Sequence, residues 1–382
     1  MIYMDNAATS FPKPPEVIEA VTAALNAPAS PGRSGHAASL AASRTIHQAR
    51  KNLSKLFGLA DNRRLAFTAN ITWALNTVLE GCGLKAGDHV ISSALEHNSA
   101  ARPLARLVAE RGILWDVAPV DGRGLSSPED FRKLLRPATK LAVVNHASNV
   151  TGALAPARAI KEALGGVPML LDAAQTAGAM DLEDVGTWLD YLCFTGHKSL
   201  LGPTGTGGLW LREGLALRPL ATGGTGSASE SLTQPDFLPD ALEAGTANTH
   251  GLAGLAAGTT FVRQTGPRNI RRHDMNLTGQ FLDGLAQIKG AAVWGPTDLE
   301  QRVSTVAVTL GGWSSSDLAA ALEREAGILT RAGLQCAPLA HQALGSLASG
   351  GVTRFSFGIF NTAAEIDVAL ETLDKLSYQK MG

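Results

Sequence analysis

The stretch PMLLDAAQ, residues 168–175, decides the fold class. Its apolar run shows no alternation of apolar and polar residues, which is typical of a strand buried on both faces of a parallel sheet. Similar runs precede and follow it, and most are separated by helical patterns such as PARAIKEALGG (156–166). This alternation predicts an α/β protein with a mostly parallel central sheet. The other expected strands are RLAFTA (64–69), DHVISSA (88–94), ILWDVAPV (113–120), KLAVVNHA (140–147), DYLCFT (190–195) and GGLWLR (207–212).

The C-terminal third of the chain has a different pattern. Residues 222–251 are rich in Gly, Ser, Thr and Pro and predict a long ordered loop, a kind of segment that is usually functional. A helix is expected from residue 250, strands at 302–310 and 351–358, and a closing helix near 363–377. A chain of 382 residues is longer than the length at which a single hydrophobic core stops growing, so more than one domain is expected. We therefore expect a large domain at 15–262 and a small C-terminal α/β domain at 263–382, with residues 1–14 packing on the small one.

Composition excludes several classes of protein. The net charge is −1, with 45% hydrophobic and 18% charged residues, so no nucleic-acid or polyanion partner is indicated. The first residues do not read as a secretory signal, and no apolar run is long enough to span a bilayer, so we expect a cytoplasmic protein without membrane contact. The three cysteines are too widely spaced for a disulfide framework or a paired metal site, and no histidine pair has ligand spacing, so no metal is expected.

Polar residues follow most of the predicted strands. Ligands of open parallel sheets bind beyond the carboxyl ends of the strands, so these residues are candidates for one site. Each has a simpler explanation alone: Thr72 or Asp172 as a helix cap, His97 as a core histidine, Lys198 as a solvated lysine. Their joint placement on one sheet edge favours a shared site. The residues are Asn70, Thr72, Glu96, His97, Asn98, Asn149, Thr151, Asp172, Gln175 and the stretch TGHKS (195–199).

Three of these groups suit pyridoxal phosphate (PLP). This cofactor needs a lysine for a Schiff base, a carboxylate beside its pyridine nitrogen and a cradle for its phosphate. Lys198, Asp172 and the helix start at 70–72 supply these in turn. A nucleotide site is a weak alternative, because GPTGTGG (202–208) lacks the P-loop arrangement and no G-x-G-x-x-G follows an early strand.

Nine short motifs together resemble the cysteine desulfurase group of class V aminotransferase-like enzymes, which have the fold of type-I PLP-dependent transferases. They occur in order from about residue 3 to residue 362, so the resemblance covers nearly the whole chain. The Asp-x-x-Gln and His-Lys motifs are typical of the class V frame, and the R-x-G-x-x-C loop separates desulfurases from most aminotransferase relatives. The motifs are MDNAATSFPKP, SPGRSGH, ALEHNS, NHASNVTG, DAAQ, TGHKSLLGPTGTG, EAGTANT, RAGLQCAPLAH and TRFSFGIFNT.

The resemblance implies a role for each candidate residue. Lys198 would bind PLP and move the substrate's Cα proton, and Asp172 would pair with the pyridine nitrogen. Gln175 would contact the phenolic oxygen, while His97 would stack on the ring and act as an acid or base. The phosphate would be held by Thr72, Thr195 and His197, with Thr246 reaching in from a second subunit of a homodimer. The substrate carboxylate would be bound by Asn149 and Arg354.

Cys336, in the loop GILTRAGLQCAPLAH (327–341), would be the sulfur acceptor. Its thiolate would attack the sulfur of L-cysteine, leaving L-alanine and a persulfide that passes to an acceptor protein. A buried apolar filler is the simpler alternative for a lone cysteine, and it is the role we expect for Cys82 and Cys193. Gln335 stands where relatives commonly have histidine, which removes a cation beside the thiol; Arg331 and His341 are candidate substitutes. Asn70 stands where many relatives have glycine, and asparagine tolerates left-handed backbone angles.

Two other classes of function remain open from the sequence. One is another PLP reaction on the same frame: selenocysteine lysis with L-selenocysteine as substrate, epimerisation or transamination. The other is a non-catalytic scaffold that retains the fold. The joint presence of Lys198, Asp172, His97 and Cys336 argues against a scaffold, which has no chemical need for all four.

Overall fold

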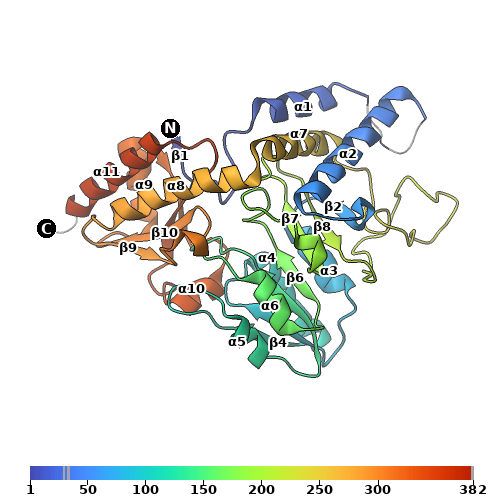
Figure 1. The fold of residues 1–382 in the computed structure, drawn as a ribbon, viewed down its shortest axis with the longest axis horizontal. Coiled ribbons are helices and arrows are strands. Elements are labelled where there is room, and N and C mark those ends of the chain that lie inside the picture. Colours follow the sequence, from blue (N-terminus) through green and yellow to red (C-terminus); the bar gives the residue numbers. More distant parts are fainter. Residues whose placement is uncertain (29–30, 32–34, 380–382) are drawn as a thin grey trace.

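The central sheet of the molecule has seven strands. The computed structural model describes residues 1–28, 31 and 35–379 (Figure 1), so positions 30 and 32–34 of the motif SPGRSGH lie outside the described residues. The strand order is β2-β8-β7-β6-β5-β3-β4, and β8 alone runs antiparallel to its neighbours. All seven strands expected in the first 212 residues form this sheet, and the α/β fold class is confirmed. They are β2 (Leu65–Thr68), β3 (His89–Ser93), β4 (Leu114–Ala118), β5 (Thr139–Asn145), β6 (Met169–Asp172), β7 (Tyr191–Thr195) and β8 (Gly207–Leu211).

Helices cover both faces of this sheet. Alternate residues of β5 show why both faces are apolar: Leu141 and Val143 face one hydrophobic cluster, and Ala142 and Val144 face another. The first cluster is completed by α3 (Ile71–Gly81) and α4 (Asn98–Arg111). The second is completed by α2 (Ala37–Leu56), α5 (Pro128–Lys133), α6 (Ala157–Leu164) and α7 (Thr249–Thr265), with α1 (Pro15–Leu25) lying along α7 (Figure 1). The result is a three-layer α/β body.

The C-terminal residues build a second sheet with its own core. Four antiparallel strands lie in the order β12-β13-β10-β9, and Phe281 and Phe355 pack together beneath them with ring centroids 4.8 Å apart. These strands are β9 (Ala291–Trp294), β10 (Thr305–Leu310), β12 (Arg331–Gly333) and β13 (Val352–Ser356). The helices of this lobe are α8 (Pro267–Leu285), α9 (Ser315–Ala326), α10 (Pro338–Leu344) and α11 (Ala363–Gln379). Short 3-10 helices occur at Asn62–Arg64, Val185–Thr187 and Leu299–Gln301.

The N-terminal segment lies against the C-terminal lobe. β1 (Ile2–Tyr3) pairs in parallel with β11 (Ile328–Leu329), and Met4 is fully buried in the C-terminal core. Gly266 separates α7, whose Val262 lies in the large core, from α8, whose Phe281 lies in the small one. The division of the chain at residues 262 and 263 stays a proposal.

A buried arginine joins the two lobes. Arg302 is fully buried and donates to the carbonyls of Pro296 and Thr305 in the C-terminal lobe and of Thr151 in the loop after β5. Gly152 of that loop has φ +77°, and a Cβ there would lie 2.4 Å from the Thr305 carbonyl oxygen. The lobes therefore meet without space for a side chain at this point. Across the residues with described structure, no helix is long and apolar enough to cross a membrane.

Candidate active site

The strand register brings the predicted site residues to one edge of the sheet. Asn145 at the end of β5 is level with Asp172 at the end of β6, and Asp172 is level with Cys193 in β7. Gly207 at the start of β8 lies between Thr68 and Thr195, the last residues of β2 and β7. The segments after β2, β3, β5, β6 and β7 carry Thr72, His97, Asn149, Gln175, His197 and Lys198, so this edge gathers them as open α/β sheets gather ligand-binding residues. Arg354 and Cys336 come from the C-terminal lobe, and Thr246 lies in the loop before α7.

Lys198 and Asp172 form the electrostatic centre of this edge. Burial lowers the pKa of Lys198 to about 8, and the negative charge of Asp172 opposes that shift. The Asp172 carboxyl is 2% exposed and accepts a hydrogen bond from the Ala174 N–H at 2.9 Å; burial raises its pKa. The loop that bears Lys198 is held by the Ser10 hydroxyl, which donates to the Lys198 carbonyl at 2.9 Å. The lysine amine is thus brought close to its neutral, nucleophilic form near physiological pH.

The contacts of His97 assign its tautomer. Its Nδ1 accepts the Ser99 N–H at 3.0 Å and lies 2.8 Å from the Ser99 hydroxyl, because His97 is the N-cap of α4. A nitrogen that accepts from a backbone amide carries no proton in the neutral ring, so the proton is on Nε2. Burial, followed by the charge of Lys198, lowers the pKa of His97 to about 4. His97 therefore offers a neutral Nε2–H donor.

The start of α3 offers a cradle for an anion. Asn70, not Thr72, caps this helix: its side chain accepts from the Trp73 N–H at 3.1 Å. The φ of Asn70 is −173°, so this position is extended, and left-handed tolerance of asparagine is not what the turn uses. Asn70 also accepts from the Ala74 N–H through its carbonyl, which leaves the first N–H groups of the helix directed outward. Thr72 is exposed in this first turn.

The end of β7 completes the cradle. The Nδ1 of His197 is buried and has no hydrogen-bond partner among the described residues, and burial lowers the pKa of His197 to about 4. Thr195 is 1% exposed, and its hydroxyl is 3.4 Å from the Thr206 carbonyl oxygen. A Cβ at Gly207 would lie 2.8 Å from the backbone of Asn70, so the strand ends approach closely here. A buried ring nitrogen without a partner is free to donate to a phosphate in the tautomer that is protonated on Nδ1, and the nearby start of α3 adds N–H donors.

A second group of contacts surrounds Arg354 on β13. Its guanidinium forms an ion pair with Asp5 and donates to the Asn149 carbonyl at 2.9 Å. The Arg354 Nε and the Asn149 Oδ1 are both buried and have no partner in the described chain. Arg331 lies opposite Arg354 in the β12–β13 ladder, and its charge lowers the pKa of His97 and Lys198. An unpaired guanidinium N–H on Arg354, with the positive charge of Arg331 opposite it, is suited to a carboxylate.

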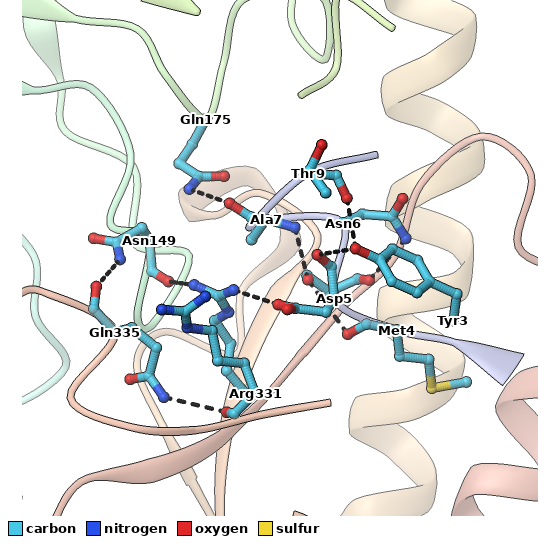
Figure 2. A network of polar contacts seen from close by, with 12 residues as sticks. Tyr3, Met4, Asp5, Asn6, Ala7, Thr9, Asn149, Gln175, Arg331 and Gln335 are labelled. Carbon is cyan, nitrogen blue, oxygen red and sulfur yellow. Dashed lines mark hydrogen bonds and ion pairs between the residues drawn. The ribbon is translucent and has the colours of Figure 1, made fainter. Parts of the chain in front are cut away.

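Gln175 lies on the loop after β6 and faces the N-terminal segment. Its Nε2 donates to the Ala7 carbonyl at 3.1 Å (Figure 2). The segment 5–10 thereby contacts the loop after β6, the loop after β7 and Arg354. Tyr3 adds to this arrangement by donating to the Thr9 carbonyl at 2.8 Å.

Cys336 is exposed and lies in the turn before α10. Its carbonyl accepts the N–H of Asn98, the residue after His97, at 2.7 Å. Gln335 does not lie beside the thiol as its position in the sequence suggested, because its side chain is buried and points into the lobe, where it contacts His341 at 3.2 Å. His341 is fully buried, so it does not replace a cation at the thiol either. Arg331 is the exposed cation of this loop.

The sequence predicted no role for some residues of this region, although Glu96 was among the candidates at the sheet edge. Asp5 reaches Arg354 across 349 positions, and only its place in MDNAATS gave a signal. Glu96 is fully buried, accepts from Asn145 and Ser93, and has a pKa raised by burial to about 7. Lys13 donates to the His197 carbonyl at 2.8 Å. Thr246 is exposed in the loop before α7, and its role in a second subunit stays a prediction.

Comparison with known proteins gives the class of protein. A family model described as aminotransferase class-V matches residues 2–369. The mostly parallel sheet, the half-buried lysine and the aspartate at the end of β6 agree with it, and the chain belongs to this family, with the fold of type-I PLP enzymes.

Similar proteins within this family are named as cysteine desulfurases. A probable cysteine desulfurase from Methanothermobacter thermautotrophicus is 31% identical, covering 98% of this chain and 94% of that protein. A cysteine desulfurase from Salmonella agona is 30% identical, and the match covers 98% of this chain and 93% of that protein. The solved apo structure of a cysteine desulfurase from Thermococcus onnurineus is similar to this structure with a TM-score of 0.91 at 30% sequence identity. The match covers 98% of this chain and 94% of that one. The resemblance to cysteine desulfurases expected from the motifs is confirmed.

Proposed function

We propose that this protein is a PLP-dependent cysteine desulfurase that converts L-cysteine to L-alanine and carries the sulfur on Cys336 as a persulfide. One observation supports this most: the exposed Cys336 is hydrogen-bonded through its carbonyl to the residue that follows His97. The backbone of Cys336 is thereby attached to the sheet edge that holds Lys198 and Asp172. The full-length similarity to proteins named cysteine desulfurase supports the same reaction.

The residues present fit PLP. The unpaired Nδ1 of His197 and the start of α3 suit its phosphate, together with the hydroxyls of Thr72 and Thr195. Asp172 suits the protonated pyridine nitrogen, and Gln175 and His97 the ring. When bound, PLP withdraws electrons from the substrate's Cα, so that a proton can leave that carbon.

The chain's own groups then bind the amino acid and move protons. The carboxylate is held by the free Nε of Arg354 and by Asn149, whose backbone already orients that guanidinium. Lys198, with a pKa of about 8, takes the Cα proton on its Nζ. His97 supplies a proton from Nε2, the only ring nitrogen that its cap contact leaves free to donate.

Sulfur transfer balances without an external oxidant. The Cys336 thiolate attacks the substrate's Sγ and forms an S–S bond as the Cβ–Sγ bond breaks. The electron pair of the broken bond stays with the carbon skeleton, and protons from the protein convert Cβ to the methyl group of alanine. The thiol sulfur is oxidised to the persulfide level while Cβ is reduced. A hydroxyl in place of the thiol lacks the nucleophilicity for this step.

The assembly around this chain is also part of the proposal. We propose a homodimer in which Thr246 of one chain reaches the phosphate cradle of the other; its exposure supports this. The exposed thiol supports transfer of the sulfur to an acceptor protein. A cytoplasmic location would keep that thiol reduced.

The test is a product assay with L-cysteine and a reductant, using wild type, Cys336→Ala and Cys82→Ala. Cys82 is a matched control, because it is a C-cap in the large core whose pKa is raised by burial to about 11. We expect equal amounts of alanine and sulfide from wild type and Cys82→Ala, and neither product from Cys336→Ala with normal cofactor absorbance. Alanine from Cys336→Ala would contradict the proposal. A parallel assay with L-selenocysteine separates the two substrates.

A further inference from the structure

The Gln335 side chain uses all of its hydrogen-bonding groups inside the C-terminal lobe. Its Nε2 donates to the carbonyls of Val352 at 3.0 Å and Arg331 at 3.2 Å, and Figure 2 shows the second contact. Its Oε1 lies 3.2 Å from His341 Nε2. Because both carbonyls are acceptors, the amide can adopt one orientation only, with its oxygen toward the histidine.

This orientation fixes the next two residues. His341 Nε2 must carry a proton to bond the Gln335 oxygen, so Nδ1 of the neutral ring is an acceptor. Ser346 Oγ lies 2.8 Å from that Nδ1 and therefore donates to it. His341 and Ser346 are 0% and 1% exposed, so water does not compete for these bonds. Ser346 also donates its N–H to the His341 carbonyl at 3.0 Å. Gln335, His341 and Ser346 thus form one hydrogen-bonded unit.

The same unit supports an unfavourable backbone. Gln335 has φ +43° and Cys336 has φ +57°, two successive left-handed residues without glycine. The carbonyls of these two residues accept hydrogen bonds from residues of the large sheet edge. Asn149 Nδ2 donates to the Gln335 carbonyl at 2.7 Å (Figure 2), and the Asn98 N–H donates to the Cys336 carbonyl at 2.7 Å. Such strain persists only where surrounding contacts determine it, and it occurs at functional sites.

We propose that Gln335, His341 and Ser346 form a hydrogen-bonded lock that holds the Cys336 turn left-handed and thereby places the thiol at the site. The three are positioning residues for sulfur transfer, and none of them touches the substrate. The inference rests on the proposed function of Cys336. It also explains why a neutral glutamine serves before the cysteine: the position fixes geometry and supplies no charge to the thiolate.

The experiment alters each of the three residues of the lock in the holoenzyme. Gln335→Leu and His341→Phe remove the hydrogen bonds, Ser346→Ala is a milder break, and His341→Gln keeps an amide donor near the Gln335 oxygen. Gln342→Ala is the control, because Gln342 lies exposed on the same short helix. For each protein we would measure the single-turnover rate of persulfide formation, the affinity for L-cysteine, and the pH midpoint of Cys336 alkylation by iodoacetamide. Cofactor absorbance and the thermal midpoint check folding.

The lock predicts that Gln335→Leu and His341→Phe slow persulfide formation by at least about tenfold, because small misplacements of a reacting atom are costly. His341→Gln recovers part of the rate, Gln342→Ala retains all of it, and the affinity for L-cysteine and the alkylation midpoint stay unchanged. Rates within about twofold of wild type in folded Gln335→Leu and His341→Phe would overturn the proposal. So would an alkylation midpoint that shifts along with the rate, because the residues would then act through charge.

A failure of the proposed function is distinguishable from a failure of the lock. If wild type forms no persulfide from L-cysteine, the function is wrong, and hydrogen exchange still tests the geometry. Faster exchange of the Asn98 and Ala337 amides in Gln335→Leu and His341→Phe than in Gln342→Ala supports the lock. Equal exchange in all of them refutes it.

Discussion

Lys198 shows how one residue is tuned by its surroundings. Only its neutral amine reacts with an aldehyde, and burial lowers its pKa from 10.5 to about 8. We therefore predict that PLP uptake by the apoprotein rises with pH around a midpoint near 8. The Asp172 carboxylate raises this pKa, so Asp172→Asn should move the midpoint to lower pH while weakening cofactor binding. Stopped-flow absorbance across pH measures both. A midpoint near 10.5 would contradict the burial of the amine.

Glu96 makes stability depend on pH. Burial raises its pKa from 4.5 to about 7, so between these values the folded protein holds a proton that the unfolded chain has lost. Stability therefore falls as pH rises through this window, by on the order of 3 kcal/mol at 1.36 kcal/mol per pKa unit. Glu96→Gln mimics the protonated acid and should lose this dependence.

Urea midpoints of wild type and Glu96→Gln at the two ends of the window test this prediction. As pH rises, the urea midpoint of wild type should fall relative to that of Glu96→Gln. An identical pH dependence in both proteins would show that Glu96 is not protonated in the folded state.

At the scale of single residues, a place in the candidate site could be predicted where both the side-chain chemistry and the position at a strand end pointed to it. The place of Lys198 and Asp172 at one sheet edge was predictable, because Asp172 ends a predicted strand and Lys198 follows another. Their side-chain chemistry suggested a cofactor. The place of Asp5 was not predictable, because a partner 349 positions away leaves no local pattern. The orientation of Gln335 was not predictable either, since sequence adjacency to Cys336 says nothing about which way a side chain points from a left-handed turn.

At the scale of elements, the start of α3 combines a cap with an anion cradle. Asn70→Ala removes the bond to the Trp73 N–H and should cost about 1 kcal/mol of stability. Asn70→Asp keeps an acceptor for that N–H but adds a negative charge beside the phosphate position. We predict little loss of apoprotein stability for Asn70→Asp and a clear rise in the dissociation constant for PLP. Thermal midpoints and equilibrium titration separate the two effects; equal PLP affinity of wild type and Asn70→Asp would place the phosphate elsewhere.

Long elements were predictable and short ones were not. The strands of the large sheet have apolar runs whose length and β-branched content mark them, as in LAVV within β5. β1, β11 and β12 span only two or three residues, and their pairing depends on tertiary contacts such as that between Ile2 and Ile328. The helix cap was misplaced for a related reason: Asn70 and Thr72 are both good caps, and only the backbone angles show which one precedes the first turn.

At the scale of the whole molecule, Arg302 joins the lobes through buried carbonyls. Arg302→Met keeps much of the volume and leaves the carbonyls of Thr151 and Thr305 without their donor. Each unpaired buried acceptor costs about 1–3 kcal/mol, so the variant should unfold at a clearly lower temperature. Because Thr151 lies two residues from Asn149, a proposed substrate-binding residue, activity per folded molecule should fall as well. A variant with the wild-type thermal midpoint would show that the lobes are held together elsewhere.

The two lobes contribute different parts of the proposed site. The large sheet supplies Lys198, Asp172 and His97, whereas Arg354 and Cys336 come from the C-terminal lobe. The alternation of strands and helices predicted the first lobe well because its pattern is local and periodic. The contact between the two lobes could not be predicted from the sequence, because it depends on the close approach of Gly152 to Thr305.

The central claim is that sulfur from L-cysteine arrives on Cys336. The most direct test is a single turnover of the reconstituted enzyme with isotopically labelled L-cysteine, followed by quenching, alkylation and peptide mass spectrometry. We predict one labelled sulfur per chain on the peptide that contains Cys336, matched by one alanine, and none on the peptides of Cys82 or Cys193. Alanine formed without label on Cys336, or label on another cysteine, would contradict the account.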